Sequence, residues 1–239
     1  MPAVPGHAQA VRAAFVKASK AQDREDVALF DQFFSRTTNG TFVEIGALDG
    51  ISLSNTLAFE TVLNWSGLLI EANPALCARL WRSARPRSIK RCSGISDRVA
   101  LETFEEGRYT STFHAVSPET ERFGHGRRRR HLVKVAPFGH LLRSAGVSSV
   151  DLISLDVEGS EARVLQSMDW NISVRVWCIE YQPAFTPPAV NASIARILNE
   201  HNYVCVPWSH SHCGQRCLAH NQLWVKRPND SPADLRHQF

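Results

Sequence analysis

The sequence has no long hydrophobic run. Apolar stretches such as residues 68–70 and 176–179 are far shorter than the ~20 residues that a membrane-spanning helix requires. The N-terminal stretch also lacks the basic and then apolar layout of a secretory signal. We therefore expect neither a membrane span nor a signal peptide.

Cysteine is scarce and unevenly spaced. Six cysteines occur among the 239 residues, and their spacing is not that of the disulfide frameworks of small secreted domains. This pattern favours a reducing compartment, and we expect a cytoplasmic protein. Hydrophobic residues make up 44% and charged residues 21% of the chain. These ordinary globular values exclude collagen-like, coiled-coil and disordered classes.

Positive charge is concentrated in two short segments. The net charge is +4, from 27 Lys and Arg against 23 Asp and Glu. Residues 79–91 contain six basic residues and no acid, and residues 127–130 are four consecutive arginines. Such segments could bind a polyanion. A solvated helix end and a solvated loop are the simpler interpretation, which we prefer.

The spacing of apolar residues predicts an α/β fold. Short β-rich runs alternate with stretches of helical periodicity, which is typical of βαβ units and a parallel sheet. Strands are expected at residues 41–46, 68–71, 88–92, 99–104, 132–135, 151–155, 175–180, 203–206 and 221–226. Helices are expected at residues 11–20, 25–34, 52–63, 75–83, 138–145, 162–168 and 193–201. In the helix over 52–63, we expect Leu53 and Leu57 to point inward.

No linker or repeat divides the chain. We expect a helical extension over residues 1–38, one domain over 39–227 and a tail over 228–239. Residues 107–131 have little apolar periodicity, so we expect a long loop over one face. His114 and His125 in this loop are candidate bases, although a solvated loop histidine is commoner.

Two glycines follow the first strand expected in the sheet. Gly46 and Gly50 allow the backbone to turn tightly and to approach a ligand. Their spacing is neither the G-x-G-x-x-G dinucleotide fingerprint nor a phosphate-binding P-loop. Glu71 ends the next strand, 21 residues after Gly50, where an acid can accept hydrogen bonds from both ribose hydroxyls. These features indicate adenosine binding without a pyrophosphate.

Several motifs follow one another in a set order. They are FVEIGALDG at 42–50, LSNT at 53–56, LNWSGLLIE at 63–71, ISD at 95–97 and VDLISLDVEGSE at 150–161. In this order and separation they resemble the FkbM family of S-adenosylmethionine-dependent methyltransferases. The resemblance covers about residues 40–180 and the terminal strand at 222–225.

The resemblance implies a class I methyltransferase fold, which is Rossmann-like. Its sheet is seven-stranded and mostly parallel, with helices on both faces and a reversed last strand. It also implies S-adenosylmethionine as cofactor and assigns eight residues to its binding. These cofactor-binding candidates are Glu44, Gly46 and Gly50 for methionine, Glu71 for ribose, Ser96 and Asp97 for adenine, and the neighbouring Ser54 and Asn55.

Acids follow two neighbouring strands at the same predicted sheet edge. Asp156, Glu158 and Glu180 are candidate catalytic residues, because methyl transfer to a hydroxyl needs a group that removes its proton. Crowded acids repel one another, which can raise a pKa into the range of a general base. The same three oxygen ligands could instead hold Mg²⁺. Glu161 is expected to favour only the N-terminus of the following helix.

Residues 210–220 are rich in cysteine and histidine. Cys213, Cys217 and His220, with His210 or His212, could form a tetrahedral zinc site. The longer finger that separates the usual ligand pairs is missing. A polar hairpin is therefore preferred, with an acceptor-binding histidine as a third interpretation, and we assign no residue as a metal ligand.

Three functions remain open at this stage. Members of the family commonly methylate hydroxyl oxygens of sugars, polyketides and related small molecules, so O-methylation of a small molecule or glycan is our first hypothesis. The arginine segments raise nucleic-acid (RNA) methylation as an alternative, which the scarcity of lysine weakens. A non-catalytic binding module is the third. Intact Gly46, Gly50, Glu71 and Asp156 argue against it.

Overall fold

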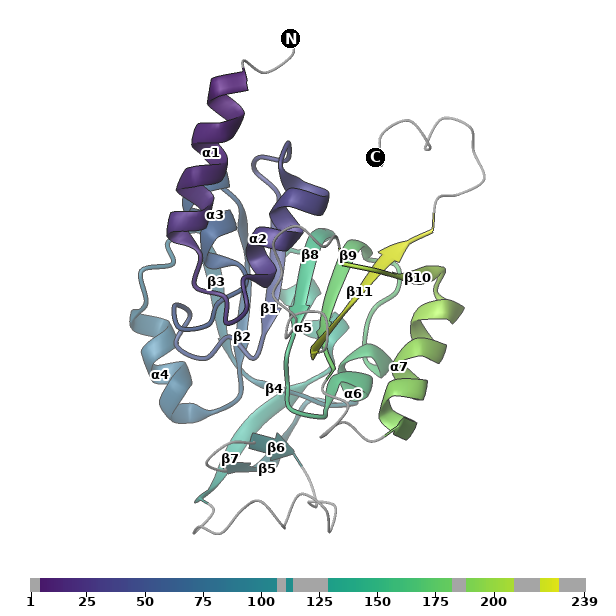
Figure 1. Ribbon diagram of the computed structural model, residues 1–239. Helices are drawn as coiled ribbons and strands as arrows, with labels where there is room; N and C mark the ends of the chain where they lie inside the picture. Colours follow the sequence, from purple (N-terminus) through teal and green to yellow (C-terminus); the bar gives the residue numbers. More distant parts are fainter. Residues whose placement is uncertain (1–4, 107–110, 114–128, 182–187, 209–219, 228–239) are drawn as a thin grey trace.

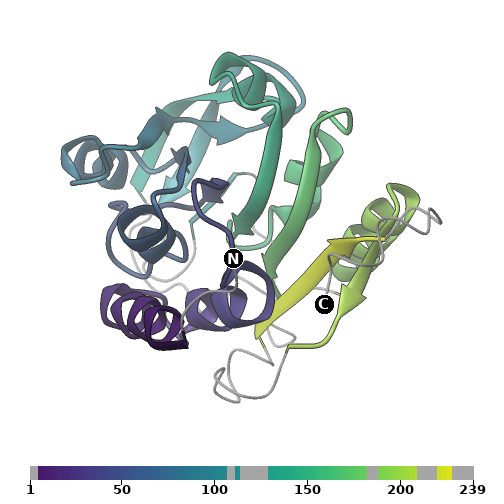
Figure 2. The same ribbon diagram turned by 90° about the horizontal axis from the view of Figure 1, so that it is seen from above.

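The protein is organised around one large sheet (Figures 1 and 2). The computed structural model describes residues 5–106, 111–113, 129–181, 188–208 and 220–227. Seven strands form the main sheet, in the order β10-β11-β9-β8-β1-β2-β3. They are β1 (Thr41–Ile45), β2 (Ser66–Glu71), β3 (Ser88–Cys92), β8 (Ser149–Leu155), β9 (Ser173–Glu180), β10 (Tyr203–Val206) and β11 (Asn221–Lys226).

Strand direction agrees with the expected fold. Strand β1 lies in the centre and pairs in parallel with β2 and β8. Strand β11 alone is reversed, because it runs antiparallel to both β9 and β10. The seven-stranded, mostly parallel sheet that the resemblance implies is therefore confirmed.

Helices cover both faces of this sheet (Figures 1 and 2). The first group is α1 (Pro5–Ala18), α2 (Glu25–Leu29), the π-helix η1 (Phe30–Phe34), α3 (Leu57–Leu63) and α4 (Pro74–Arg82). The second group is α5 (Phe138–Ser144), α6 (Glu161–Gln166) and α7 (Pro188–Glu200). None of the helices in the described ranges is long and apolar enough to cross a membrane.

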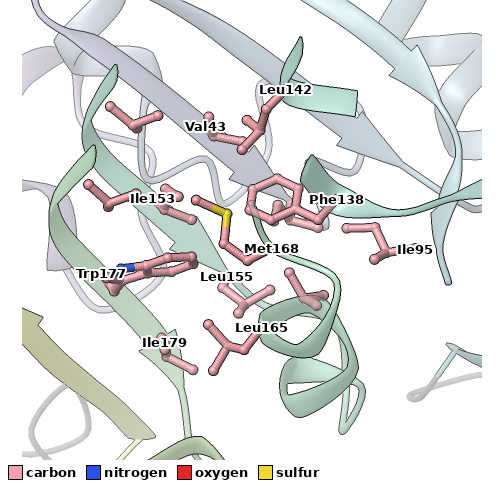
Figure 3. Packing of buried hydrophobic residues seen from close by; sticks show 14 of the residues in the cluster. Val43, Ile95, Phe138, Leu142, Ile153, Leu155, Leu165, Met168, Trp177 and Ile179 are labelled. Carbon is pink, nitrogen blue, oxygen red and sulfur yellow. The ribbon is translucent and has the colours of Figure 1, made fainter. Parts of the chain in front are cut away.

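The two cores form on opposite faces because successive strand residues point in opposite directions. In β1, Val43 joins the core under α5, α6 and α7, whereas Phe42 joins the core under the N-terminal helices. In β8, Ile153 joins the first of these cores and Leu152 joins the second. Figure 3 shows the first of these cores. Both faces are apolar, as is typical of buried parallel strands.

The N-terminal helices share the core of the sheet domain. Phe15 of α1 stacks on Phe30 of η1, with ring centroids 4.5 Å apart. Phe34 packs edge-on against both Phe59 and Trp65. Because these rings are almost fully buried, the first helices are integral to the domain and hold the chain between them in a defined place.

A second, smaller sheet replaces part of the expected loop. Its order is β4-β7-β5-β6, with β4 (Gly94–Ile95), β5 (Ala100–Glu106), β6 (Ser111–Phe113) and β7 (Arg129–Ala136). Strand β7 begins earlier than the predicted 132–135, because it pairs along the whole of β5, and Arg130 forms an ion pair with Glu105 at 2.7 Å. The rest of the predicted loop, including His114, His125 and two of its four consecutive arginines, lies outside the described residues.

Helix α3 begins five residues later than predicted, at Leu57 rather than at residue 52. Leu53 is half exposed and has a left-handed backbone with φ of 59°, so the expectation that it points inward was wrong. The turn before α3 is held instead by Glu44 of β1, which accepts hydrogen bonds from Asn55 and Thr56. The bond from the Asn55 backbone N–H gives that group a side-chain partner in place of a helical one.

One disulfide, which the sequence analysis did not expect, joins α4 to β3. Cys77 and Cys92 are paired, with their Cα atoms 5.6 Å apart, a normal separation for a disulfide. The sequence pattern missed the pair because only the packing of α4 beside β3 brings the two residues together. Its presence removes the basis for inferring a reducing compartment, and a cytoplasmic location stays a prediction.

Candidate active site

A cavity of about 630 Å³ opens at the carboxyl ends of the parallel strands. Ligands bind at this edge in open α/β sheets. Its wall follows the strand order, from Ser93 after β3 and Glu71 of β2 to Gly46 after β1, and on to Asp156 after β8 and Glu180 of β9. Sequence-distant residues thus meet in one place because parallel strands end together.

Only glycine fits at position 46, because the ends of β1 and β8 approach each other closely there. Its φ is 85°, and a Cβ atom placed on it would lie 1.9 Å from the backbone oxygen of Asp156. The Asp156 amide donates a hydrogen bond to the Ile45 carbonyl at 3.1 Å. A side chain at position 46 would force the ends of β1 and β8 apart and change the floor of the cavity.

Gly50 packs beside the end of α4. It does not line the cavity. Its φ is 80°, and a Cβ atom there would lie 2.7 Å from Leu80 and 2.9 Å from Ser83, both at the end of α4. Gly50 therefore allows α4 to pack against the turn.

Glu44 lines the cavity, but both of its carboxylate oxygens are used within the protein. Asn55 donates its backbone N–H to Oε1 at 2.8 Å, and the hydroxyls of Ser54 and Thr56 donate to Oε2 at 2.8 and 2.6 Å. Ser54 is buried behind the wall, whereas Asn55 lines it. Glu44 thus fixes the turn that presents Asn55.

Asn55 keeps a free acceptor. Its side-chain amide donates to the Ser154 hydroxyl at 3.0 Å. Its Oδ1 atom is buried and accepts no hydrogen bond in the described part of the protein. A buried acceptor without a donor is costly, so a ligand that donates a hydrogen bond there would be stabilised.

Arg85 lies under this turn, a position that the sequence analysis missed. Its guanidinium is fully buried and pairs with Glu60. It also donates to the Gly50 carbonyl at 2.7 Å and to the Thr56 hydroxyl at 2.8 Å. One member of the basic segment at 79–91 is therefore internal, in contrast to the solvated surface expected.

Glu71 stands at the cavity wall as predicted, at the end of β2. Leu48 and Asn73 donate backbone N–H groups to its two oxygens at 2.8 and 2.7 Å. Burial raises the pKa of Glu71, and these hydrogen bonds partly offset the effect. A carboxylate has about four acceptor positions, so acceptor capacity remains for a ligand in the cavity.

Ser96 and Asp97 do not reach the cavity wall. Ser96 donates to Glu102 at 2.6 Å and accepts from Arg163, so it ties α6 to the second sheet. Asp97 is exposed and pairs with Arg98. The residues that do line this end are Ser93, Ile95, Phe104 and Glu106. Three of them, Ile95, Phe104 and Glu106, belong to the second sheet, whose position the sequence did not reveal.

Asp156, Glu158 and Glu180 come together as predicted, with one carboxylate oxygen from each within 4.8 Å of the others. Asp156 is accessible to the cavity but otherwise enclosed by protein atoms. This enclosure, together with Glu180, raises the pKa of Asp156 well above its ordinary value. Burial and Glu180 also raise the pKa of Glu158, to about 7.

Glu161 is structural, as the sequence analysis expected. It is buried, and one oxygen accepts hydrogen bonds from the backbone N–H groups of Val157 and Gly159. It does not line the cavity. Its role is to hold the turn that carries Asp156 and Glu158.

Strained backbone gathers around the cavity. Leu48, Leu53 and Glu158 all line it and have φ values of 50°, 59° and 55°. A non-glycine residue in this left-handed region is disfavoured by about 1–2 kcal/mol. Such strain is found mainly at functional sites, where the surrounding structure enforces it.

Of the cysteine- and histidine-rich segment, only His220 is described, and it lines the cavity beside Asn221. The other candidate zinc ligands, His210, His212, Cys213 and Cys217, lie outside the described residues. Gln22, Asp23 and Glu25 complete the wall from the N-terminal side. The sequence offered no signal for these three, because they lie outside every motif.

Comparison with known proteins decides the family. A sequence model described as the methyltransferase FkbM domain matches residues 44–205. The chain belongs to the FkbM methyltransferase family. Its domain is accordingly that of an S-adenosylmethionine-dependent methyltransferase, and family membership does not define the acceptor. No curated protein sequence matches this chain.

Solved structures place the FkbM domain among methyltransferase folds. The FkbM methyltransferase from Methylobacillus flagellatus is 15% identical, with a TM-score of 0.50 over 89% of this chain. This chain spans only 58% of the length of that protein. A protein from Clostridium thermocellum that is described as an rRNA-methylase is 7% identical, with a TM-score of 0.49 over 88% of this chain and 98% of its own. At 15% identity, the likeness to the Methylobacillus flagellatus protein shows the fold alone.

The FkbM cavity fits the cofactor that the family implies. Glu71 has acceptor capacity left for ribose hydroxyls, and Asn55 offers an unpartnered acceptor. The volume of about 630 Å³ lies in the range of small-molecule and cofactor sites. Glu44, Gly50 and Ser54 would act on this site through the turn, and their direct contact with a cofactor stays a prediction, as it does for Ser96 and Asp97.

Proposed function

We propose that this enzyme transfers a methyl group to a hydroxyl oxygen of a small molecule or glycan. The observation that carries the proposal is the placement of Asp156, which directly follows β8 and lines the cavity beside Glu180, with its pKa raised. A carboxyl group whose pKa is raised above its ordinary value is a stronger base and is better suited to accepting a proton.

The cofactor half of the cavity is assigned to β1 and β2. Glu71 would accept hydrogen bonds from ribose hydroxyls, and Asn55 would accept one from the amino acid end. The glycine turn at Gly46 keeps the floor open. When bound, S-adenosylmethionine supplies an electrophilic methyl carbon.

The acceptor half is assigned to β8 and β9. Asp156 and Glu180 lie within hydrogen-bonding reach of one another, and both belong to the carboxylate cluster at this end of the cavity. The ionised member of the pair accepts the proton of the acceptor hydroxyl, and the pair then carries it as a carboxylic acid. These residues would also hold the hydroxyl oxygen of the acceptor in line with the methyl carbon and the sulfur atom of the cofactor.

Mg²⁺ bound by Asp156, Glu158 and Glu180 is the alternative arrangement within the same function. Three carboxylates within 4.8 Å are the oxygen ligands that this ion prefers. In that arrangement the three carboxylates would hold the ion, and the ion would orient the methyl acceptor and lower the pKa of its hydroxyl.

Asp156→Asn tests the base. We expect kcat to fall by about 10²–10⁴-fold while the dissociation constant for S-adenosylmethionine, measured by calorimetry, stays unchanged. Wild-type enzyme treated with EDTA should keep its activity if the carboxylate acts alone, and should lose it and recover with added Mg²⁺ if the ion is required. An unchanged kcat in a folded Asp156→Asn variant would contradict both arrangements.

RNA methylation remains the second candidate. Arg79, Arg82 and Arg87 are exposed on or near α4, and Arg79 reaches the cavity. No lysine lines the cavity among the described residues, which disfavours lysine-based methylation of a ribose hydroxyl. Tight binding of RNA near physiological salt, lost on neutralising Arg82 and Arg87, would reverse our ranking, because phosphate contacts are salt-dependent.

A further inference from the structure

One wall of the cavity lies outside the family segment. The family model matches residues 44–205, whereas Gln22, Asp23 and Glu25, together with His220 and Asn221, also line the cavity. We call these five residues the terminal wall. Because the shared segment already contains the residues assigned to the cofactor and to proton removal, the terminal wall is available for a task particular to this chain.

The terminal wall is built firmly into the fold. Ala21 forms a parallel bridge with Leu53, whose strained backbone also faces the cavity. Glu25 is buried and accepts hydrogen bonds from the Asp23 amide at 2.9 Å and from the Asn221 side chain at 3.3 Å. Glu25 thus joins the N-terminal segment to the start of β11 and positions Asp23.

The terminal wall stands over the acceptor half of the cavity. Asn221 lies opposite Glu180 in the β11–β9 ladder, and Glu180 neighbours Asp156. Strands β9 and β11 are separated from β2, which carries Glu71, by β8 and β1. A molecule held against the terminal wall would therefore meet the proton-accepting pair and not the ribose-binding end.

The charge of this half is negative. Asp23 is half-buried at the wall, and no described residue donates a hydrogen bond to its carboxylate. Among the described residues, the basic side chains that line the cavity are Arg79 and His220. Arg79 lies on α4, next to the cofactor half. His220 is thus the one basic side chain among the described residues of this half, against the carboxylates of Asp23, Asp156, Glu158 and Glu180. A positively charged group on the acceptor would find a partner in Asp23.

We propose that the terminal wall selects the acceptor, and that Asp23 recognises an ammonium group on a hydroxylated acceptor. This inference rests on the proposed function. Glu25 is a positioning residue for Asp23, and Leu53 supplies an apolar contact beside it. The substrate class is therefore a hydroxylated amine, such as an amino sugar or amino alcohol, and not a neutral or anionic polyol.

Matched acceptors test this inference. Glucamine against sorbitol, and glucosamine against glucose, differ by one ammonium group in place of a hydroxyl. S-adenosylhomocysteine formation gives kcat/KM for each probe with wild type, Asp23→Asn, Gln22→Glu and the remote control Glu200→Gln. We expect the amine to be preferred by the wild type. This preference should fall about tenfold in Asp23→Asn, rise in Gln22→Glu and stay unchanged in Glu200→Gln.

The outcomes separate the two proposals. A wild type that prefers sorbitol and glucose, an unchanged preference in Asp23→Asn, or no turnover of any probe by protein that binds S-adenosylmethionine would overturn the inference alone. Absence of S-adenosylmethionine binding in calorimetry would instead refute the proposed function. Asp23→Asn must keep the wild-type affinity for S-adenosylmethionine, because a general disturbance of the cavity would lower both.

Discussion

The backbone oxygen of Asp156 occupies the space in which a side chain on Gly46 would begin, 1.9 Å from the position of its Cβ atom. Gly46→Ala should therefore destabilise the protein by about 2–5 kcal/mol, because it adds a left-handed alanine to a backbone clash. Gly146→Ala is the matched control, since Gly146 also has a positive φ but no atom within 4 Å. Urea denaturation should show a loss of only about 1–2 kcal/mol there. Equal losses in the two variants would contradict the close approach of β1 and β8.

Arg85 should be essential to stability although it belongs to a basic segment. Arg85→Met leaves Glu60 buried without its partner, and breaking a buried ion pair in this way costs about 3–5 kcal/mol. Removing the remaining charge in Arg85→Met/Glu60→Gln should recover part of the loss. Arg82→Met, on the exposed side of α4, should change the free energy of unfolding by less than about 0.5 kcal/mol. Chemical denaturation of the four proteins measures these differences.

Asp26 makes folding stability depend on pH. Burial raises its pKa from 3.8 to about 7, so between these values the folded protein binds a proton that the unfolded chain releases. Stability is then greatest at low pH and falls as the pH rises through 7, by up to about 4 kcal/mol. Asp26→Asn should flatten the change in unfolding free energy between pH 5 and pH 8. A wild-type protein that becomes more stable over this interval, with the same slope in the variant, would contradict the assignment.

Glu158 should show opposite effects on stability and on activity. Its left-handed backbone, with φ of 55°, suits glycine, so Glu158→Gly should raise the free energy of unfolding by about 0.5–1 kcal/mol. The same change removes one of the three clustered carboxylates and should lower kcat. Asn202→Gly relaxes a comparable backbone, with φ of 66°, away from the cavity and should leave kcat unchanged. Thermal denaturation measures the change in stability of each variant, and initial rates measure its kcat.

The sequence predicts the sheet well because its signals are local. Val43 and Ile153 sit in short apolar runs between glycine or proline turns, and Glu71 and Asp156 are placed simply by ending strands that run in parallel. Gly46 is also marked locally, by the turn that follows β1. The strand order and most of the cavity floor follow from these positions.

Other parts of the site depend on contacts that no local pattern shows. Arg85 resembles its exposed neighbours in sequence and is distinguished only by the buried Glu60 it meets. Leu53 fits a helical periodicity, yet the carboxylate of Glu44 delays the helix. Phe104 reaches the cavity because β5 folds back in a second sheet. Each is a tertiary effect that overrides the local preference.

The hydrogen bond between Glu25 and Asn221 joins residues 196 positions apart, which bears on how the enzyme matures during synthesis. The N-terminal helices and the central strands leave the ribosome first and can pack before the last strand exists. The partner of Glu25 is among the last described residues to be made. The terminal wall is consequently completed only once Asn221 has been made, so a chain that stops before β11 can hold most of its core without a finished terminal wall.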